Sequence, residues 1–190
     1  DTAYVTCQEA NAIAVLDLES GTFTGIYSIG FEDHSKAAID IDKKDETYAP
    51  KTYESLRGIR MPDGISLYET GGDTYLITAN EGDAREWGEK PDKYENEKKN
   101  EKSPSKKIEL EAKVTWYDTN TADGLNSDYD YLFGGRSFTV LRVTKDGLEE
   151  VFDSGSDFER ITAETLADYL NCSNDNVDVE DRSGKKGPEP

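Results

Sequence analysis

The sequence predicts an all-β fold, either a β-propeller or a β-sandwich. Short runs of β-prone and apolar residues recur three times along the chain, and each run turns back on itself at a tight turn. The units start roughly 60 to 70 residues apart, longer than the roughly 40 to 50 residues of standard propeller repeats. Short strands with a turn at every step disfavour an α/β layout.

The first unit is predicted as a β-hairpin followed by a third strand. Residues 3–7 are β-prone, and residues 12–18 form a second apolar run after a turn at 8–11. A further turn leads into a β-prone run at 22–29. Three short strands joined by tight turns make most of one antiparallel blade.

The second and third units repeat this pattern. The second has predicted strands at 64–69 and 74–80 around a Gly-Gly-Asp turn. The third has predicted strands at 136–143 and 148–153 around a Lys-Asp-Gly turn. Insertion of long acidic loops accounts for the spacing between units.

Two stretches differ from the strand pattern. Residues 88–107 are nearly all Glu, Lys, Asn, Asp, Ser and Pro, which predicts a mobile charged surface loop. Residues 162–170 predict one short amphipathic helix, capped by Thr162, whose apolar stripe packs in the core. The stripe recurs at i, i+3, i+4 and i+7 and consists of Ala163, Leu166, Ala167 and Leu170.

An acidic loop is the main candidate for a metal site. Calcium takes six to eight hard oxygen ligands, and alternating Asp and Asn around a glycine turn can supply them. The spacing departs from an EF-hand, because the glycine comes one residue late. The alternative is an Asx-rich loop whose carboxylates cap its own backbone. The candidate ligands are Asp118, Asn120, Asp123, Asn126, Asp128 and Asp130.

A second candidate site follows the predicted strand 74–80. Glu81, Asp83 and Arg85 can line the top of a propeller, or they can form an intramolecular ion pair with Glu86 or Arg136. His34 is the only histidine and is predicted to lie in a solvated loop. One histidine without a paired-cysteine set does not build a zinc site. No serine or cysteine stands in a recognisable nucleophile elbow.

The amino-acid composition limits the classes of partner that the chain is expected to bind. With 22 basic and 41 acidic residues the formal net charge is -19, so nucleic acids and anionic lipid surfaces are disfavoured and cations or basic protein surfaces are favoured. No apolar run approaches the ~18 residues of a membrane span. Cys7 and Cys172 either form one disulfide or remain unpaired, and Asn171 fits a glycosylation acceptor.

The chain begins at Asp1 and stops at Pro190 within a Gly-Pro-Glu-Pro cluster. We therefore expect residues 1–190 to be a segment of a single larger domain, with any signal or anchor lying outside it.

Five ordered blocks resemble the choice-of-anchor I family. They are 30–35 (GFEDHS), 75–85 (YLITANEGDAR), 133–138 (FGGRSF), 152–159 (FDSGSDFE) and 181–190 (DRSGKKGPEP). The resemblance implies a partial β-propeller of antiparallel blades, related to mesenchyme-specific cell-surface glycoproteins and to bacterial cell-wall-anchored proteins. Because members of the family are much longer, it also implies that the remaining blades lie outside this chain.

Two functions are consistent with these observations. The first is a non-catalytic extracellular or cell-surface propeller for adhesion or for contact with a protein, mineral or calcium. The alternative is a calcium-dependent phosphoesterase, in which calcium ions clamp phosphate and basic residues such as Arg182, Lys185 and Lys186 meet it.

Overall fold

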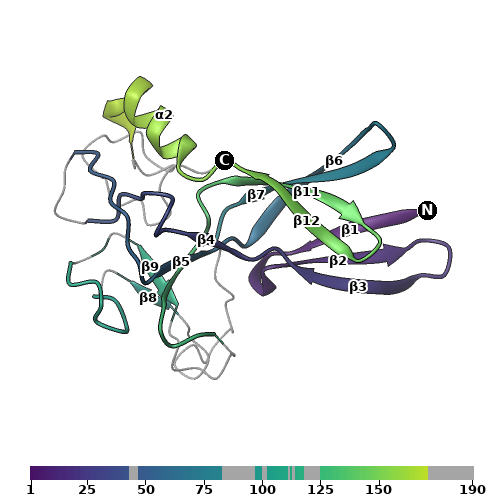
Figure 1. Ribbon diagram of the computed structural model, residues 1–190, viewed down its shortest axis with the longest axis horizontal. Helices are drawn as coiled ribbons and strands as arrows, with labels where there is room; N and C mark the ends of the chain where they lie inside the picture. Colours follow the sequence, from purple (N-terminus) through teal and green to yellow (C-terminus); the bar gives the residue numbers. More distant parts are fainter. Residues whose placement is uncertain are drawn as a thin grey trace.

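The computed structural model describes residues 1–42, 47–82, 97–99, 102–110, 112, 114–117 and 125–170. The described chain is mostly β and forms three sheets of three, five and four strands (Figure 1). The all-β prediction is confirmed. In the view of Figure 1, the three- and four-stranded sheets extend to one side, and the five-stranded sheet and the helix α2 lie on the other.

The three-stranded sheet is the predicted first unit. Its strands are β1 (Thr2–Cys7), β2 (Ala12–Asp17) and β3 (Thr22–Ser28), paired antiparallel in that order. The β1–β2 connection is a single 3-10 turn, and Asn11 ends it with a φ of 51°. Asparagine tolerates this left-handed conformation better than most residues, which suits it to a tight turn.

The four-stranded sheet unites the predicted second and third units. It has the order β12-β11-β7-β6, with β6 (Pro62–Thr70), β7 (Asp73–Asn80), β11 (Phe138–Thr144) and β12 (Gly147–Asp153). Both hairpins are confirmed. Because β7 pairs with β11, the two units form one antiparallel sheet instead of two repeats.

The five-stranded sheet was not predicted. Its order is β4-β5-β10-β9-β8, and β5 and β10 run parallel. Its strands have three or four residues each, too few to show a clear period-2 pattern. Strand β8 lies within the segment predicted as a mobile loop, most of which is outside the described residues. The strands are β4 (Phe31–Asp33), β5 (Leu56–Ile59), β8 (Glu97–Lys99), β9 (Thr115–Tyr117) and β10 (Asp130–Phe133).

Three apolar clusters hold the sheets together. One lies between the three- and four-stranded sheets, where Ile13 and Ile29 pack with Leu76 and Leu141. The other two lie around the five-stranded sheet, one of them built on the fully buried Trp116. The three- and four-stranded sheets therefore pack face to face, and the five-stranded sheet has cores of its own.

The helix differs from its prediction. Helix α2 spans Asp157–Thr165, and a 3-10 turn follows at Ala167–Tyr169. Of the predicted stripe, Leu170 is buried but Leu166 is 55% exposed. The helix begins earlier because Glu159 is drawn into a buried ion pair, a tertiary contact that apolar periodicity does not report. Within the part of the chain that the structure describes, no helix has the length and apolarity to cross a membrane.

Candidate functional site

A buried arginine lies where the sheets meet. Arg60 follows β5 and is 4% exposed. Its Nη1 donates to Glu150 Oε2 at 2.6 Å and to the Ile29 carbonyl oxygen at 2.9 Å. Its Nη2 lies 3.5 Å from Glu32 Oε2 and 3.4 Å from Asp153 Oδ2. One guanidinium thus joins β4, β12 and the end of β3. We name Arg60, Glu32, Asp153 and Glu150 the Arg60 cluster.

The Arg60 cluster has more negative than positive charge. Burial is the main reason that the pKa of Glu32 rises to about 7, and the charge of Asp153 and a hydrogen bond with it add to the rise. Arg60 opposes the rise without cancelling it. Burial alone lowers the pKa of Arg60, but its hydrogen bond to Glu150 and the carboxylate charges outweigh burial and raise it. At neutral pH Glu32 is therefore close to the midpoint of its titration.

Hydroxyl and amide groups connect the Arg60 cluster to the middle of the four-stranded sheet. Asn80 Nδ2 donates to Ser137 Oγ at 2.8 Å and to Thr139 Oγ1 at 2.7 Å. Thr139 Oγ1 in turn donates to Asp153 Oδ2 at 2.5 Å. All three polar side chains are buried. Since buried polar groups are costly unless they are paired, this chain of bonds fixes the ends of β7, β11 and β12 relative to one another.

A second buried ion pair ties α2 to the rest of the molecule. Arg136 Nη1 donates to Glu159 Oε1 at 2.8 Å, and both side chains are at most 3% exposed. Arg136 Nη1 also donates to the Asp40 carbonyl oxygen, and the Asp40 N–H lies 3.3 Å from both Glu159 oxygens. Burial and the charge of Glu159 raise the pKa of Tyr48 to about 12. This pair therefore joins α2, the start of β11 and the segment around Asp40.

His34 is buried, so the prediction of a solvated loop histidine is wrong. It is 2% exposed, and its Nδ1 lies 3.0 Å from the Ala37 carbonyl oxygen. Its Nε2 lies within 3.1 Å of the position that a Cβ on Gly58 would occupy. Burial lowers the pKa of His34 to about 4, so the ring is neutral at physiological pH.

The predicted calcium loop is described only from Asn126 onward; Asp118, Asn120 and Asp123 lie outside the described residues. Asp130 is buried, and its two oxygens accept from the N–H and hydroxyl of Ser105 at 2.9 and 2.6 Å. Asn126 Oδ1 accepts from the Asp128 N–H. Asn126 thus caps backbone within the loop, Asp130 binds the distant Ser105, and Asp128 Oδ1 lies 4.0 Å from Lys107 Nζ. Among the described residues, no group of three or more His, Cys, Asp or Glu side chains is placed to hold a metal ion.

Of the predicted top-face residues, Glu81 is described, while Asp83 and Arg85 lie outside the described residues. Glu81 Oε2 accepts from Gln8 Nε2 at 2.8 Å, which joins the β1–β2 turn to the end of β7. Arg136 pairs with Glu159, and the ion pair between this group and Arg136 stays a prediction. Cys7 is half-buried, and Cys172 and Asn171 lie outside the described residues.

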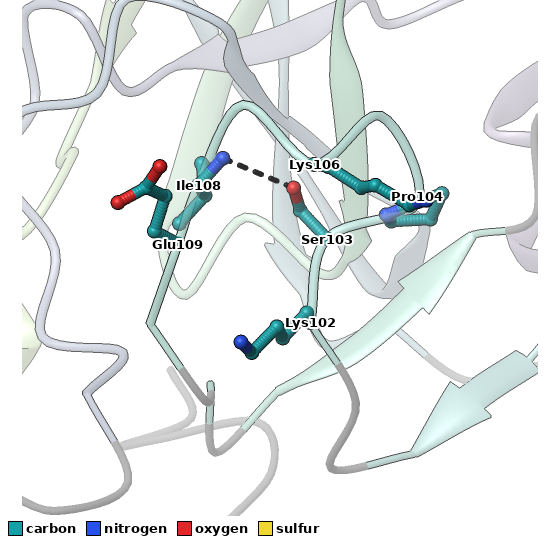
Figure 2. Close-up of a pocket in the computed structure, with 6 residues that line it drawn as sticks. All are labelled: Lys102, Ser103, Pro104, Lys106, Ile108 and Glu109. Carbon is teal, nitrogen blue, oxygen red and sulfur yellow. Dashed lines mark hydrogen bonds between the residues drawn. The ribbon is translucent and has the colours of Figure 1, made fainter.

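A pocket of about 640 Å³ lies in the loop between β8 and β9, and none of its lining residues belongs to either ion cluster. Figure 2 shows that one short segment supplies all of its labelled lining residues, with the Ile108 N–H donating to Ser103 Oγ across it. The lining mixes two lysines with Glu109, so it does not favour an anion or a cation.

Sequence reasoning missed the Arg60 cluster, although a signal was present. Glu32, Asn80, Arg136 and Asp153 each belong to one of the blocks that carry the family resemblance, and the structure brings these blocks together. Arg60 itself stands between the apolar residues Ile59 and Met61, where a charge predicts a buried partner.

Comparison with known proteins gives one match. The family model for the choice-of-anchor I domain matches residues 1–190. Neither the curated proteins nor the solved structures contain a match to this chain. Since the family model matches the chain from end to end, the protein belongs to the choice-of-anchor I domain family.

Proposed function

We propose that the chain is part of a β-propeller and that this propeller is a non-catalytic domain at the cell surface. Two antiparallel sheets of consecutive or nearly consecutive strands, packed face to face around a shared apolar cluster, are consistent with neighbouring blades. The five-stranded sheet is then built from two insertions: β4 and β5 lie between β3 and β6, and β8, β9 and β10 lie between β7 and β11. The name of the family supports attachment to a cell surface.

The observation that carries the non-catalytic role is the internal pairing of the buried charges. Arg60 and Arg136 contact carboxylates from other elements, and both guanidinium groups are almost fully buried. A catalytic group needs access to a substrate, whereas these groups connect sheets and helix. The described charged residues Glu32, Arg136, Asp153 and Glu159 of the family blocks therefore serve to hold the domain together, and its acidic exterior is left for recognition.

The partners that this exterior favours are cations and basic protein or mineral surfaces. The net charge of -19 attracts such partners and repels nucleic acids and anionic membranes. We also propose that the loop from Asp118 to Asp130 binds calcium. Asp130 already accepts two hydrogen bonds from Ser105, so the other members of the loop are the expected ligands of the calcium ion.

The proposal is tested on the full-length protein in its own cells. Protease applied to intact cells should release peptides of this domain, and the purified protein should not hydrolyse a chromogenic phosphomonoester in millimolar calcium. Domain peptides protected until lysis would overturn the surface location.

Phosphomonoester turnover would overturn the non-catalytic role in favour of a calcium-dependent phosphoesterase. A variant with Asp123→Asn and Asp128→Asn serves as the matched control. Turnover that this variant loses depends on the acidic loop, and turnover that it keeps comes from elsewhere in the protein or from a contaminant.

A further inference from the structure

The Arg60 cluster joins all three sheets at one buried point. Glu32 lies on β4 of the five-stranded sheet, and Asp153 and Glu150 lie on β12 of the four-stranded sheet. The Ile29 carbonyl oxygen, which also accepts from Arg60, follows β3 of the three-stranded sheet. Three carboxylates thus contact one guanidinium, so the charges of the cluster cannot balance while all three are ionised.

The two most buried carboxyls of the cluster, Glu32 and Asp153, have different hydrogen-bond surroundings although each side chain is 9% exposed. Asp153 accepts from the Gly155 N–H at 2.7 Å and from the Thr139 hydroxyl at 2.5 Å. In the described part of the chain, Glu32 accepts one long bond, from Arg60 Nη2 at 3.5 Å. Several donors stabilise the anionic form of a carboxyl, whereas burial with one weak donor favours the neutral form.

We infer that Glu32 carries a proton in the closed structure, donates it in a hydrogen bond to the Asp153 carboxylate, and so makes the contact between β4 and β12 a joint that loosens as pH rises. Loss of this proton to solvent leaves two carboxylates beside the same guanidinium. Because their repulsion is strong in a buried site, it favours movement of β12 away from β4. This device lies inside the fold and does not depend on the proposed surface role.

The pKa of Glu32 agrees with this assignment. Burial is the main cause of its rise to about 7. The charge of Asp153 and a hydrogen bond with Asp153 add to the rise, and Arg60 opposes it. Glu32 therefore holds a proton at pH values where an exposed glutamate is ionised.

The other charged groups near Glu32 are paired or neutral. Glu150 contacts the guanidinium at 2.6 Å, and its side chain is 47% exposed. Asp33, the next residue of β4, pairs with Arg57 at 2.9 Å. Burial lowers the pKa of His34 to about 4, so its ring is neutral above that pH. The proton of Glu32 thus determines how much charge separates β4 from β12.

The direction of the pH effect follows from the protons bound in the two states. In the closed joint the pKa of Glu32 is about 7, and in an open joint that exposes it to water the pKa returns towards its ordinary 4.5. Between these two values the open joint releases a proton that the closed joint holds, so opening becomes up to about tenfold more favourable per pH unit. This opening moves β12 and leaves His34 in its own loop, where it contacts the Ala37 carbonyl oxygen.

Hydrogen–deuterium exchange of the full-length protein, measured by mass spectrometry at half-unit pH steps, tests the inference. After correction for the intrinsic pH dependence of exchange, protection of a peptide covering 147–156 should fall about tenfold or more between pH 4.5 and 6.5. Protection of a peptide covering 2–17 should not change. An equal fall in both peptides would overturn the joint, because the proton would then act on the whole fold. Unchanged protection in both would overturn it as well.

Two substitutions identify the groups that carry the effect. Glu32→Gln replaces the protonated carboxyl with an amide that can donate to Asp153, so protection of 147–156 should stay high at every pH. Asp153→Asn removes the opposing charge and offers a donor to an ionised Glu32, so the fall should be less than about tenfold. The second variant gives an independent answer if the first does not fold.

Glu149→Gln is the matched control on the same strand. Glu149 is exposed and pairs with Arg142 at 2.6 Å, outside the Arg60 cluster, so its replacement should leave the pH profile of 147–156 unchanged. A profile like that of the parent protein in Glu32→Gln or in Asp153→Asn would overturn the inference, because the proton would then belong to another group.

Discussion

At the scale of single residues, two buried titratable groups have opposite effects on stability. The pKa of Glu32 is raised to about 7 by burial and by Asp153, so the folded state favours its protonated form. The pKa of His34 is lowered to about 4 by burial, so the folded state favours its neutral form. The sign of each effect follows from which state, folded or unfolded, binds the proton more tightly.

These two groups predict a flat region in the dependence of stability on pH. The contribution of Glu32 is fully present below its ordinary pKa of 4.5 and is lost as pH rises through about 7. The contribution of His34 is present above its ordinary pKa of 6.5 and is lost as pH falls through about 4. Between pH 4.5 and 6.5 the two slopes cancel.

Replacing Glu32 with Gln should remove its contribution to the pH dependence of stability, so that the contribution of His34 can be measured alone. We expect the free energy of unfolding of Glu32→Gln to rise between pH 4.5 and 6.5 relative to the parent chain, by about 1.4 kcal/mol per pH unit at most. Urea unfolding of both chains at half-unit pH steps measures this difference in the free energy of unfolding. Glu19→Gln, at an exposed turn, should leave the profile unchanged. Parallel profiles for Glu32→Gln and the parent would contradict the raised pKa of Glu32.

At the scale of elements, the sequence predicts the strands and turns that are determined by local residue patterns. The hairpins β1–β2, β6–β7 and β11–β12 were predicted because apolar runs and turn residues alternate along them. The pairing of β7 with β11 was not, because residues 81–137 separate them and no local pattern reports a partner so far along the chain. The start of α2 was missed for a related reason, since Glu159 is buried by an arginine 23 residues away.

The attachment of α2 is expected to depend on Glu159. Glu159→Ala leaves Arg136 buried without its carboxylate and should destabilise the fold by about 3 to 5 kcal/mol. Replacing both Arg136 and Glu159 with Met should cost much less, because no unpaired charge remains. Urea unfolding measures all three chains.

The exposed pair on the same helix is the control for Glu159. Glu164 accepts from Arg160 at the surface, and Glu164→Ala should change the free energy of unfolding by about 0.5 kcal/mol or less. An equal loss of unfolding free energy in Glu159→Ala and Glu164→Ala would show that burial of the Arg136–Glu159 pair does not matter.

At the scale of the whole molecule, sequence blocks that are far apart along the chain meet in the structure, which the sequence analysis did not predict. Blocks 30–35, 75–85, 133–138 and 152–159 meet around Arg60 and Arg136. Sequence reasoning placed the chemistry in exposed acidic loops because carboxylates next to turns resemble ligands. It could not show that the other carboxylates were buried against arginines, since that depends on how the sheets pack.

Calcium, if it binds the loop from Asp118 to Asp130, should stabilise the whole chain. A ligand bound only by the folded state adds about 2.7 kcal/mol at a hundredfold excess over its Kd. We expect the Tm in millimolar calcium to exceed that in chelator, and Asp123→Asn with Asp128→Asn to abolish the difference. Magnesium at the same concentration controls for general screening of the net charge. An equal Tm with and without calcium would leave the loop as a solvated segment.

The pairing of β7 with β11 across residues 81–137 also affects how the protein folds. The three hairpins need only local contacts and form within microseconds, but the four-stranded sheet must wait until a long loop closes. The entropy of closure grows slowly with length, at about 0.6 kcal/mol per doubling, so segments inserted between β7 and β11 lower stability only slightly. Related chains can therefore differ greatly in the size of this insertion while keeping the same two packed sheets.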